Sequence, residues 1–243
     1  MNNHPILFSG DMVRAILEGR KTQTRRVIRI RLTKEQKTNG YSEVPFDILP
    51  MNDNAVSHQW ITLQRKEPNN KGLVIKYPMD PGDHLWVRET WRITGWNESG
   101  DWCIEYKDGT HKWFDDVEEV DEETTTRYWI DCTNDCEKAN IPEDPNTGNY
   151  IFDDQHPVPT RWRPSIFLPR WASRITLEIL KIRVERIQDI TPEDCEAEGV
   201  GYRLNDLGWR YAFGSLWNSI NEKRGFGWDV NPFVWVIEFR RLP

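Results

Sequence analysis

Residues 19–26 hold the side chains of this chain that are best suited to do chemistry. They place one amine, two hydroxyls and three guanidinium groups within eight residues, directly after a short apolar pattern with helical spacing at 12–17. A lysine crowded by arginines loses its proton more readily, because like charges disfavour its charged form. Thr24 lies three residues after Lys21 and is therefore a candidate nucleophile that a neutral amine would activate. The same residues also suit a basic helix C-terminus capped by Gly19, and both interpretations stay open.

Length and hydropathy limit the classes of protein to which the chain can belong. It has 243 residues, enough to bury a core in one large domain or two small ones. The sequence contains no run of 18 apolar residues that would predict a membrane-spanning helix. Its first residues lack the basic start and apolar stretch of a signal segment. We therefore expect a protein of a reducing cytoplasm without a membrane partner.

The cysteines give no clear sign of disulfides or of a metal. Four cysteines are too few and too scattered for a disulfide framework. Cys132 and Cys136 have a spacing that can begin a zinc site, but no second Cys/His pair follows at a suitable distance. We therefore expect no metal and no cofactor.

Charge is distributed very unevenly along the chain. The net charge is -7, but residues 96–160 hold 18 acidic against 4 basic side chains, and the remainder holds 28 basic against 21 acidic. A basic scaffold with many tryptophans suits phosphate contact and base stacking, although the same side chains can simply solvate strand faces. The acidic segment 96–160 is expected to be an insertion. Its acidic run at 115–123 is either a solvated loop, or a segment that mimics nucleic-acid charge or covers the basic face.

Local patterns predict several helices and strands. A strand is expected over 84–91, and the alternation of Ile175, Leu177 and Ile179 predicts a second over 172–187. Thr191 fits a helix N-cap, followed by Pro192 at the first helical position and Asp194 at the capping-box distance, and the helix ends at Gly199. A further helix is expected over 211–220 and a final strand over 233–239. Within the insertion, two aromatic patches are expected to be strands, Trp102–Tyr106 and Arg127–Ile130.

Four motifs follow one another along the chain in a specific order. They are the lysine motif of residues 19–26, Pro81-Gly82-Asp83 with Leu85 and Val87, a helix ending in Glu198, and the closing strand Val234–Phe239. This order resembles the ASCH domain family, a branch of the PUA-like superfamily, over residues 5–30, 76–95 and 161–243. The long form, with Arg161–Ile166 and Pro169–Arg174, is similar to ASCH proteins of phage and prophage genomes. The resemblance implies an α+β fold, namely a PUA-like β-barrel with flanking helices. It also implies a single domain over 1–243 that contains 96–160 as an acidic insertion.

At the lysine motif the chain is similar to the small bacterial amidohydrolases of this family that deacetylate 4-N-acetylcytidine. Their catalytic lysine, threonine and glutamate correspond to Lys21, Thr24 and Glu198, with Glu196 as the alternative glutamate. The resemblance implies a hydrolase that removes an acyl group from the exocyclic amine of a modified nucleoside or base. This chain departs from those enzymes in having Arg25 at an apolar position and in its long insertion.

The chemistry that this resemblance implies can be written for the residues of this chain. Neutral Lys21 takes the proton of Thr24, whose oxygen attacks the acyl carbonyl, and protonated Glu198 donates to the leaving nitrogen. Arg26 or backbone N–H groups stabilise the oxyanion. The candidate substrate-binding residues are Arg25, Arg26, Arg88, Trp91 and Trp171. Trp86, Trp91 and Trp171 could each stack on the base, and core packing is the favoured alternative for each of them.

Two other functions remain open from the sequence. One is a non-catalytic module that binds RNA or a modified base, in which Lys21, Arg25 and Arg26 only hold phosphate. The second is a ribonuclease, which would act without metal because no carboxylate cluster suggests a two-metal site. In each case the expected partner is a modified nucleoside or RNA.

Overall fold

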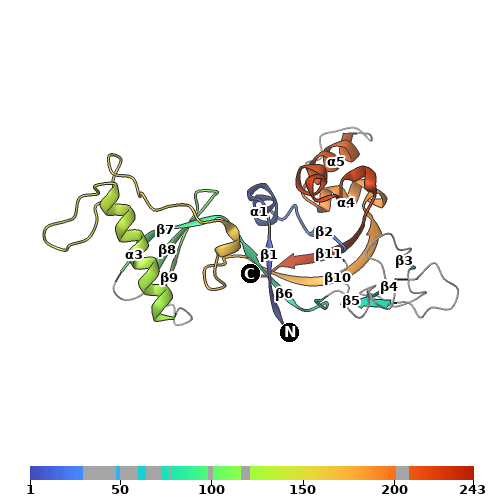
Figure 1. Cartoon of the computed structure of the whole chain (residues 1–243), viewed down its shortest axis with the longest axis horizontal. Coiled ribbons are helices and arrows are strands. Elements are labelled where there is room, and N and C mark those ends of the chain that lie inside the picture. The colour runs from blue at the N-terminus through green and yellow to red at the C-terminus, as the bar shows by residue number, and fades with distance from the viewer. Residues whose placement is uncertain are drawn as a thin grey trace. The chain divides into compact units, whose positions relative to one another are not determined.

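The chain contains both helices and sheets, which confirms the α+β class (Figure 1). The computed structural model describes residues 1–29, 48–49, 60–63, 73–76, 78–97, 101–115, 121–200 and 208–243. The chain divides into two compact units. Unit 1 consists of Met1–His4, Ala15–Leu85 and Leu177–Pro243, and unit 2 consists of Pro5–Arg14 and Trp86–Thr176.

The largest sheet has five strands in the order β1-β6-β10-β11-β2. These strands are β1 (Asn3–Leu7), β6 (His84–Arg88), β10 (Thr176–Arg186), β11 (Phe233–Arg241) and β2 (Gln23–Val27). In unit 1, β11 pairs antiparallel with both β10 and β2, so the last strand of the chain lies between them. The alternation predicted for 172–187 is confirmed, because Ile175, Leu177 and Ile179 are all buried. The pairings among the described residues leave this sheet open.

Two smaller sheets of three strands lie one in each unit. Unit 1 contains β3 (Ile48–Leu49), β4 (Trp60–Leu63) and β5 (Leu73–Lys76). Unit 2 contains β7 (Trp91–Trp96), β8 (Trp102–Tyr106) and β9 (His111–Phe114). Both sheets are antiparallel, with consecutive strands paired.

The predicted strand over 84–91 is interrupted. Residues 84–88 form β6 and a new strand, β7, begins at Trp91. Between them the buried carboxylate of Glu89 accepts hydrogen bonds from Arg174 at 2.6 and 2.9 Å. Since a buried carboxylate needs a partner of opposite charge, this ion pair accompanies the break in the strand.

The helix ends follow the capping signals of the sequence. Helix α1 (Gly10–Leu17) is closed by Gly19 at a φ of 74°, where its N–H donates to Ile16 O at 3.0 Å. Helix α4 (Pro192–Ala197) starts from the Thr191 cap with a complete capping box. Helix α5 (Gly208–Asn221) includes the predicted span 211–220. These predictions are confirmed, because caps satisfy backbone groups that the helix itself leaves unpaired.

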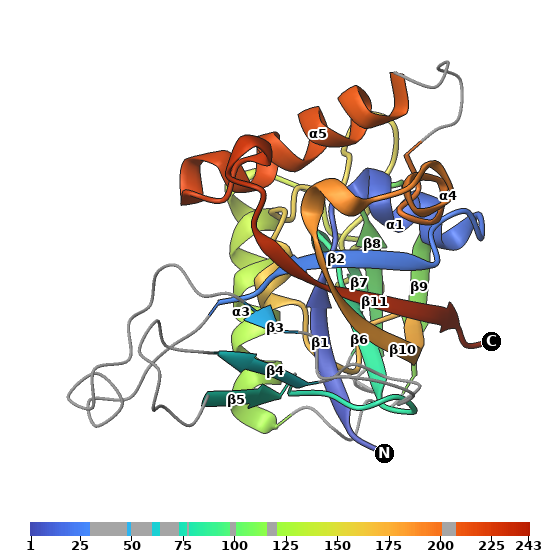
Figure 2. The same ribbon diagram turned by 90° about the vertical axis from the view of Figure 1, so that its right-hand side faces the viewer.

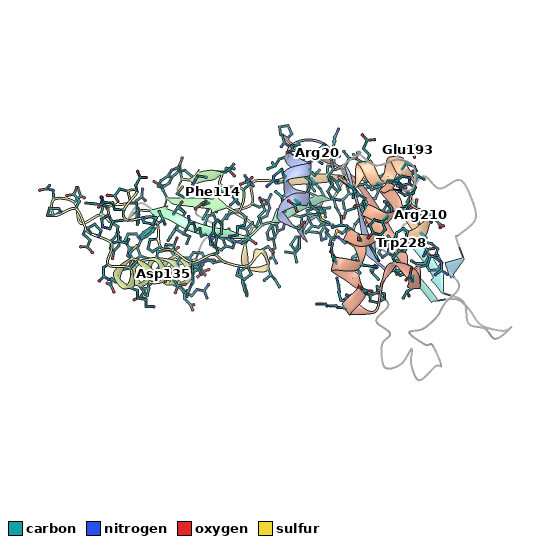
Figure 3. All side chains as sticks on the ribbon, turned by 90° about the horizontal axis from the view of Figure 1, so that it is seen from above. Arg20, Phe114, Asp135, Glu193, Arg210 and Trp228 are labelled. Carbon is teal, nitrogen blue, oxygen red and sulfur yellow. The ribbon has the colours of Figure 1, made fainter. Side chains whose placement is uncertain are left out.

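Helices α4 and α5 lie on one side of the β2–β11–β10 strands of unit 1 (Figure 2). A buried cluster joins them, made of Ile187, Ile190, Cys195, Phe213, Trp217, Val234 and Val236. Short 3-10 turns complete the connections at η2 (Ile187–Asp189), η3 (Glu222–Arg224) and η4 (Trp228–Val230). Figure 3 shows Trp228 and Arg210 in this unit, with the guanidinium carbon 5.7 Å from the indole centroid.

Unit 2 contains a helix where the sequence predicted a strand. Trp102–Tyr106 is a strand, β8, as expected, but residues 127–130 lie inside the helix α3 (Glu122–Lys138), so this strand prediction is wrong. Asp121 caps α3 by accepting from Thr124 N, and three residues at four-residue spacing are buried along one face: Tyr128, Cys132 and Cys136. This helical period outweighs the local β-propensity of the aromatic patch.

The acidic segment 96–160 lies wholly within unit 2, which also takes in 86–95 and 161–176. Part of its acidic run is helical, since Glu122 and Glu123 form the first turn of α3, where negative charge offsets the helix dipole. The hydrophobic core of unit 2 combines α3 with β7 and β8, and Cys132 is one of its members. Every helix among the described residues is too short or too polar to cross a membrane.

Candidate functional site

Two of the predicted catalytic residues, Lys21 and Glu198, are in direct contact. Their side chains meet across 177 residues of chain, with Lys21 Nζ 2.7 Å from Glu198 Oε2. Both side chains are buried in unit 1. A backbone bridge joins the same two residues, and Thr22 N donates to Ala197 O at 2.8 Å beside it. The chain segment after α1 is therefore held against the end of α4.

Local structure at the end of α4 sets the position of Glu198. Glu198 is the C-cap residue of the helix, and Gly199 follows with a φ of 81°. A Cβ atom on Gly199 would lie 2.9 Å from Ala15 Cβ and 3.2 Å from Lys21 Cβ. Glycine is thus required here both for its left-handed backbone and for the close approach of α1 and Lys21. Glu196 is exposed, so Glu198 is the glutamate that reaches the amine.

Among the described residues, the Lys21 amine donates three hydrogen bonds to Gln23 and Glu198. It donates to Gln23 O at 2.7 Å, to Glu198 O at 2.9 Å and to Glu198 Oε2 at 2.7 Å. These match the three N–H donors of an ammonium group. Burial lowers the pKa of Lys21 below its ordinary value, against the opposing effect of Glu198, and the neighbouring Arg25 and Arg26 lower this pKa further. Hydrogen bonds stabilise the charged form of the Lys21 amine, whereas burial favours its neutral form.

Arg25 is the second cation at the Glu198 carboxylate. Its NH1 donates to Glu198 Oε1 at 3.2 Å, while its NH2 donates to Asp194 Oδ2 at 2.7 Å and to Glu185 Oε2 at 3.0 Å. Only 1% of its side chain is exposed. Three carboxylates therefore neutralise a guanidinium that has almost no contact with solvent.

The ion pairs extend across the sheet through Arg183 on β10. Its NH2 donates to Asp194 Oδ1 at 3.0 Å, and its other nitrogens donate to Glu185 and Glu238. Gln23 Nε2 also donates to Asp194 Oδ1, at 3.0 Å. We call this set the carboxylate network; its charged members are Lys21, Arg25, Arg183, Glu185, Asp194, Glu198 and Glu238. Three cations thus face four carboxylates.

Strand alternation places Thr24 away from this network. The side chains of Gln23 and Arg25 both reach Asp194, so their face of β2 is turned toward α4. Since successive side chains of a strand point to opposite faces, Thr24 and Arg26 belong to the other face. Thr24 is buried there, opposite Ile237 of β11. The structure thus brings Lys21, Arg25 and Glu198 together but places Thr24 on the opposite face of its strand.

The remaining predicted binding residues belong to unit 2. Trp91 is fully buried and packs edge-to-face on Tyr128, with ring centroids 5.8 Å apart, which is the core-packing alternative. Trp171 packs edge-to-face on Phe114, which Figure 3 labels, at 5.5 Å. The guanidinium of Arg88 lies over the buried Trp86 ring at 4.5 Å.

Several members of the carboxylate network were not anticipated from the sequence. Arg183 and Glu185 follow the alternation of β10 and therefore share one of its faces. This pattern of charged residues is visible in the sequence, but it is typical of a solvated strand. Asp194 was assigned only to the helix cap, and it does accept from Thr191 N at 3.3 Å while also binding Arg25 and Gln23. One carboxylate therefore serves the cap and the network together.

Comparisons with known protein families, with curated proteins and with solved structures find no match for this chain. The chemistry assigned to Lys21 and Glu198 therefore depends on their geometry and on the order of motifs in the sequence.

Proposed function

We propose that this protein is a hydrolase that removes an acyl group from the exocyclic amine of a modified nucleoside or base, of the 4-N-acetylcytidine type. The observation that carries the proposal is the buried contact of 2.7 Å between Lys21 Nζ and Glu198 Oε2. Transfer of one proton within this pair converts ammonium and carboxylate into amine and carboxylic acid. Those neutral forms are the base and the acid that amide cleavage requires.

Proton balance supports a role for the pair in both halves of the reaction. In the first half the Lys21 amine takes the proton of the attacking hydroxyl, and the Glu198 acid gives its proton to the leaving nitrogen. The pair is then ammonium and carboxylate. In the second half Glu198 takes a proton from water, and Lys21 returns its proton to the departing hydroxyl oxygen. The starting forms are restored without any other proton carrier.

The nucleophile has weaker support than the proton-transferring pair. Thr24 is proposed for this role from the resemblance, with its hydroxyl three residues from Lys21. Thr24 lies on the opposite face of β2 from Gln23 and Arg25. The role of Lys21 and Glu198 in proton transfer is therefore better supported than the role of Thr24 as the nucleophile. If a water molecule attacked in place of the Thr24 hydroxyl, Lys21 would take a proton from that water and Glu198 would give its proton to the leaving nitrogen.

We also propose a PUA-like barrel and membership of the ASCH domain family. The supporting feature is that β2, which contains the second half of the lysine motif, pairs with the final strand β11, so that distant motifs meet in one sheet. Closure of that sheet in an experimental structure is the test, and an open sheet there would contradict the barrel.

The carboxylate network counts against the non-catalytic alternative in which Lys21 and Arg25 hold phosphate. Lys21 is 2% exposed, and the Arg25 side chain is 1% exposed. Both cations already have carboxylate partners. A phosphate would have to displace those carboxylates and leave them buried without a cation, which is strongly unfavourable.

The experiment that tests the function is incubation of the purified chain with 4-N-acetylcytidine and, in parallel, with unacetylated RNA. Mass spectrometry is expected to show cytidine and acetate from the first substrate and unchanged RNA from the second. Glu198→Gln is expected to abolish product, because the amide cannot give a proton. Glu196→Gln is the matched control, with an exposed side chain two residues away, and is expected to keep full activity. Shortened RNA with no cytidine formed would establish the ribonuclease instead.

A further inference from the structure

Unit 2 contains a pocket of about 450 Å³ that the proposed function does not use. Its lining comes from α3, from the first residue of β7, from the segment before η1 (Ser165–Phe167) and from the last residue of η1. The lining residues are Trp91, Arg127, Tyr128, Asp131, Arg161, Trp162, Arg163, Pro164 and Phe167. Its volume falls in the range of small-molecule sites. A hydrogen bond holds the two sides together, since the backbone N–H of Arg161 donates to Asp135 Oδ2 on α3 at 3.3 Å (Figure 3 labels Asp135).

The pocket is cationic although it lies in the acidic part of the chain. Arg127, Arg161 and Arg163 line it together with a single carboxylate, Asp131. Arg161 NH2 and Arg163 NH2 lie 2.5 and 3.0 Å from the same oxygen, Asp131 Oδ2. Among the lining residues arginines therefore outnumber carboxylates three to one, and the carboxylate of Asp135 also lies beside Arg161. Such a cluster of arginine donors suits the planar recognition of phosphate or carboxylate oxygens.

A buried donor in the wall of the pocket lacks an acceptor. Trp91 is fully buried, and its Nε1 has no hydrogen-bond partner among the described residues. A buried N–H without an acceptor is energetically unfavourable. An acceptor atom on a bound ligand would satisfy it.

The rim of the pocket offers apolar surface to the same ligand. Phe167 is 65% exposed, and the neighbouring Ile166, also in η1, is 54% exposed. Exposed aromatic rings beside arginines are typical of sites where a base stacks while its phosphate is neutralised. The pocket therefore combines an anion-binding side with a planar apolar side.

We propose that this pocket binds a nucleoside monophosphate. The phosphate would contact the arginines, and the base would lie on Phe167. A phosphate monoester carries about -1.5 to -2 charges at pH 7, which suits a lining in which arginines outnumber carboxylates. The proposal is independent of the hydrolase, because Lys21 and Glu198 belong to unit 1.

Calorimetric titration of the full chain with cytidine 5′-monophosphate, cytidine and inorganic phosphate tests the proposal. The nucleotide is expected to bind at least tenfold more tightly than either fragment. The double variant Arg127→Gln with Arg161→Gln should weaken nucleotide binding at least tenfold and keep its melting temperature, since both side chains are exposed. Arg170→Gln, an exposed arginine of unit 2 outside the pocket, is the matched control and should bind like the parent.

Two further variants separate this pocket from the hydrolase site. Phe167→Ala should weaken binding of the nucleotide but leave inorganic phosphate unchanged, because it removes only the stacking surface. Glu198→Gln should leave nucleotide binding unchanged. Equal affinity for the nucleotide and for cytidine would overturn the proposal. A loss of nucleotide binding in Glu198→Gln, with unchanged binding in the double arginine variant, would also overturn it.

Discussion

Lys21 and Arg25 bind different oxygens of one carboxylate, that of Glu198, at 2.7 and 3.2 Å. Two cations therefore fix the orientation of a buried acid. Arg25 donates to one carboxylate oxygen, whereas burial of Lys21 lowers the pKa of its amine and so favours transfer of its proton. The balance between these two effects sets how readily the ion pair becomes an amine and a carboxylic acid, which is the step on which the proposed hydrolysis depends.

Replacement of Lys21 by arginine separates a base from a mere positive charge. Lys21→Arg keeps the charge beside Glu198, but the guanidinium stays protonated at neutral pH and cannot act as a base. We expect no release of cytidine from 4-N-acetylcytidine, measured as an initial rate, in a variant whose circular dichroism matches the parent. Full activity in this variant would mean that the position supplies only charge.

Two substitutions of Thr24 identify the nucleophile. If its hydroxyl attacks the acyl group, Thr24→Ser retains turnover, and Thr24→Val, which keeps the shape, loses it. The parent should then show an acylated chain by intact mass when the reaction is quenched early. Because Thr24 lies on the opposite face of β2 from Arg25, activity in Thr24→Val would assign the attack to water and leave Lys21 and Glu198 in their roles.

The predictable parts of the fold were those determined by short-range signals. The Thr191 cap and the glycine ends of α1 and α4 depend on backbone groups within a few residues, and such patterns are visible in sequence. The choice of Glu198 over Glu196 depended on the resemblance rather than on a local signal, and Glu198 is the C-cap residue directly after the last residue of α4. In contrast, the aromatic patch at 127–130 was assigned to a strand, because its buried helical period only becomes clear over the whole of α3.

The carboxylate network was harder to anticipate than the pair within it. Arg183 and Glu185 alternate along β10 as charged residues on a solvated strand would. Only the packing of α4 over that face turns them into partly buried partners of Arg25 and Asp194. Sequence periodicity shows which side chains share a face, but it does not show what covers that face.

The contribution of Arg25 to stability can be compared with that of a surface arginine. Arg25→Met leaves Glu185, Asp194 and Glu198 without one of their cations, and we expect a loss of about 3–5 kcal/mol in the free energy of unfolding. Arg240→Gln removes an exposed pair with Glu178, which is expected to be worth less than about 1 kcal/mol. Urea denaturation of the two variants measures the difference. Equal losses would show that the buried network adds no more than a surface pair.

The lowered pKa of Lys21 predicts a pH dependence of stability. Between this lowered pKa and the ordinary value of 10.5, the unfolded chain binds more protons at this residue than the folded one. Stability contributed by the residue therefore rises with pH through that window. Urea denaturation at several pH values below 10.5 should give a difference in unfolding free energy, parent minus Lys21→Met, that increases with pH. A difference that stays constant or falls would contradict the lowered pKa.

Gly199 and Gly19 provide a matched pair for testing the close approach behind Lys21. Both have left-handed backbones, with φ of 81° and 74°. A Cβ on Gly19 would meet nothing within 4 Å, whereas one on Gly199 would lie 2.9 Å from Ala15 Cβ and 3.2 Å from Lys21 Cβ. Gly19→Ala should therefore cost only the backbone strain of about 1–2 kcal/mol. Gly199→Ala should cost more, since the end of α1 and Lys21 must also move.

The variants Gly199→Ala and Gly19→Ala also test whether the position of Lys21 matters for the proposed hydrolysis. Because the added methyl group of Gly199→Ala displaces Lys21 from Glu198, hydrolysis should fall in this variant even at temperatures where it remains folded. Gly19→Ala should lose stability without a matching loss of rate, because its methyl group meets no atom of the site. Thermal denaturation and initial rates measured on both variants provide the comparison. Equal stability losses, or an unchanged rate in Gly199→Ala, would mean that the approach of Gly199 to Lys21 does not position the amine.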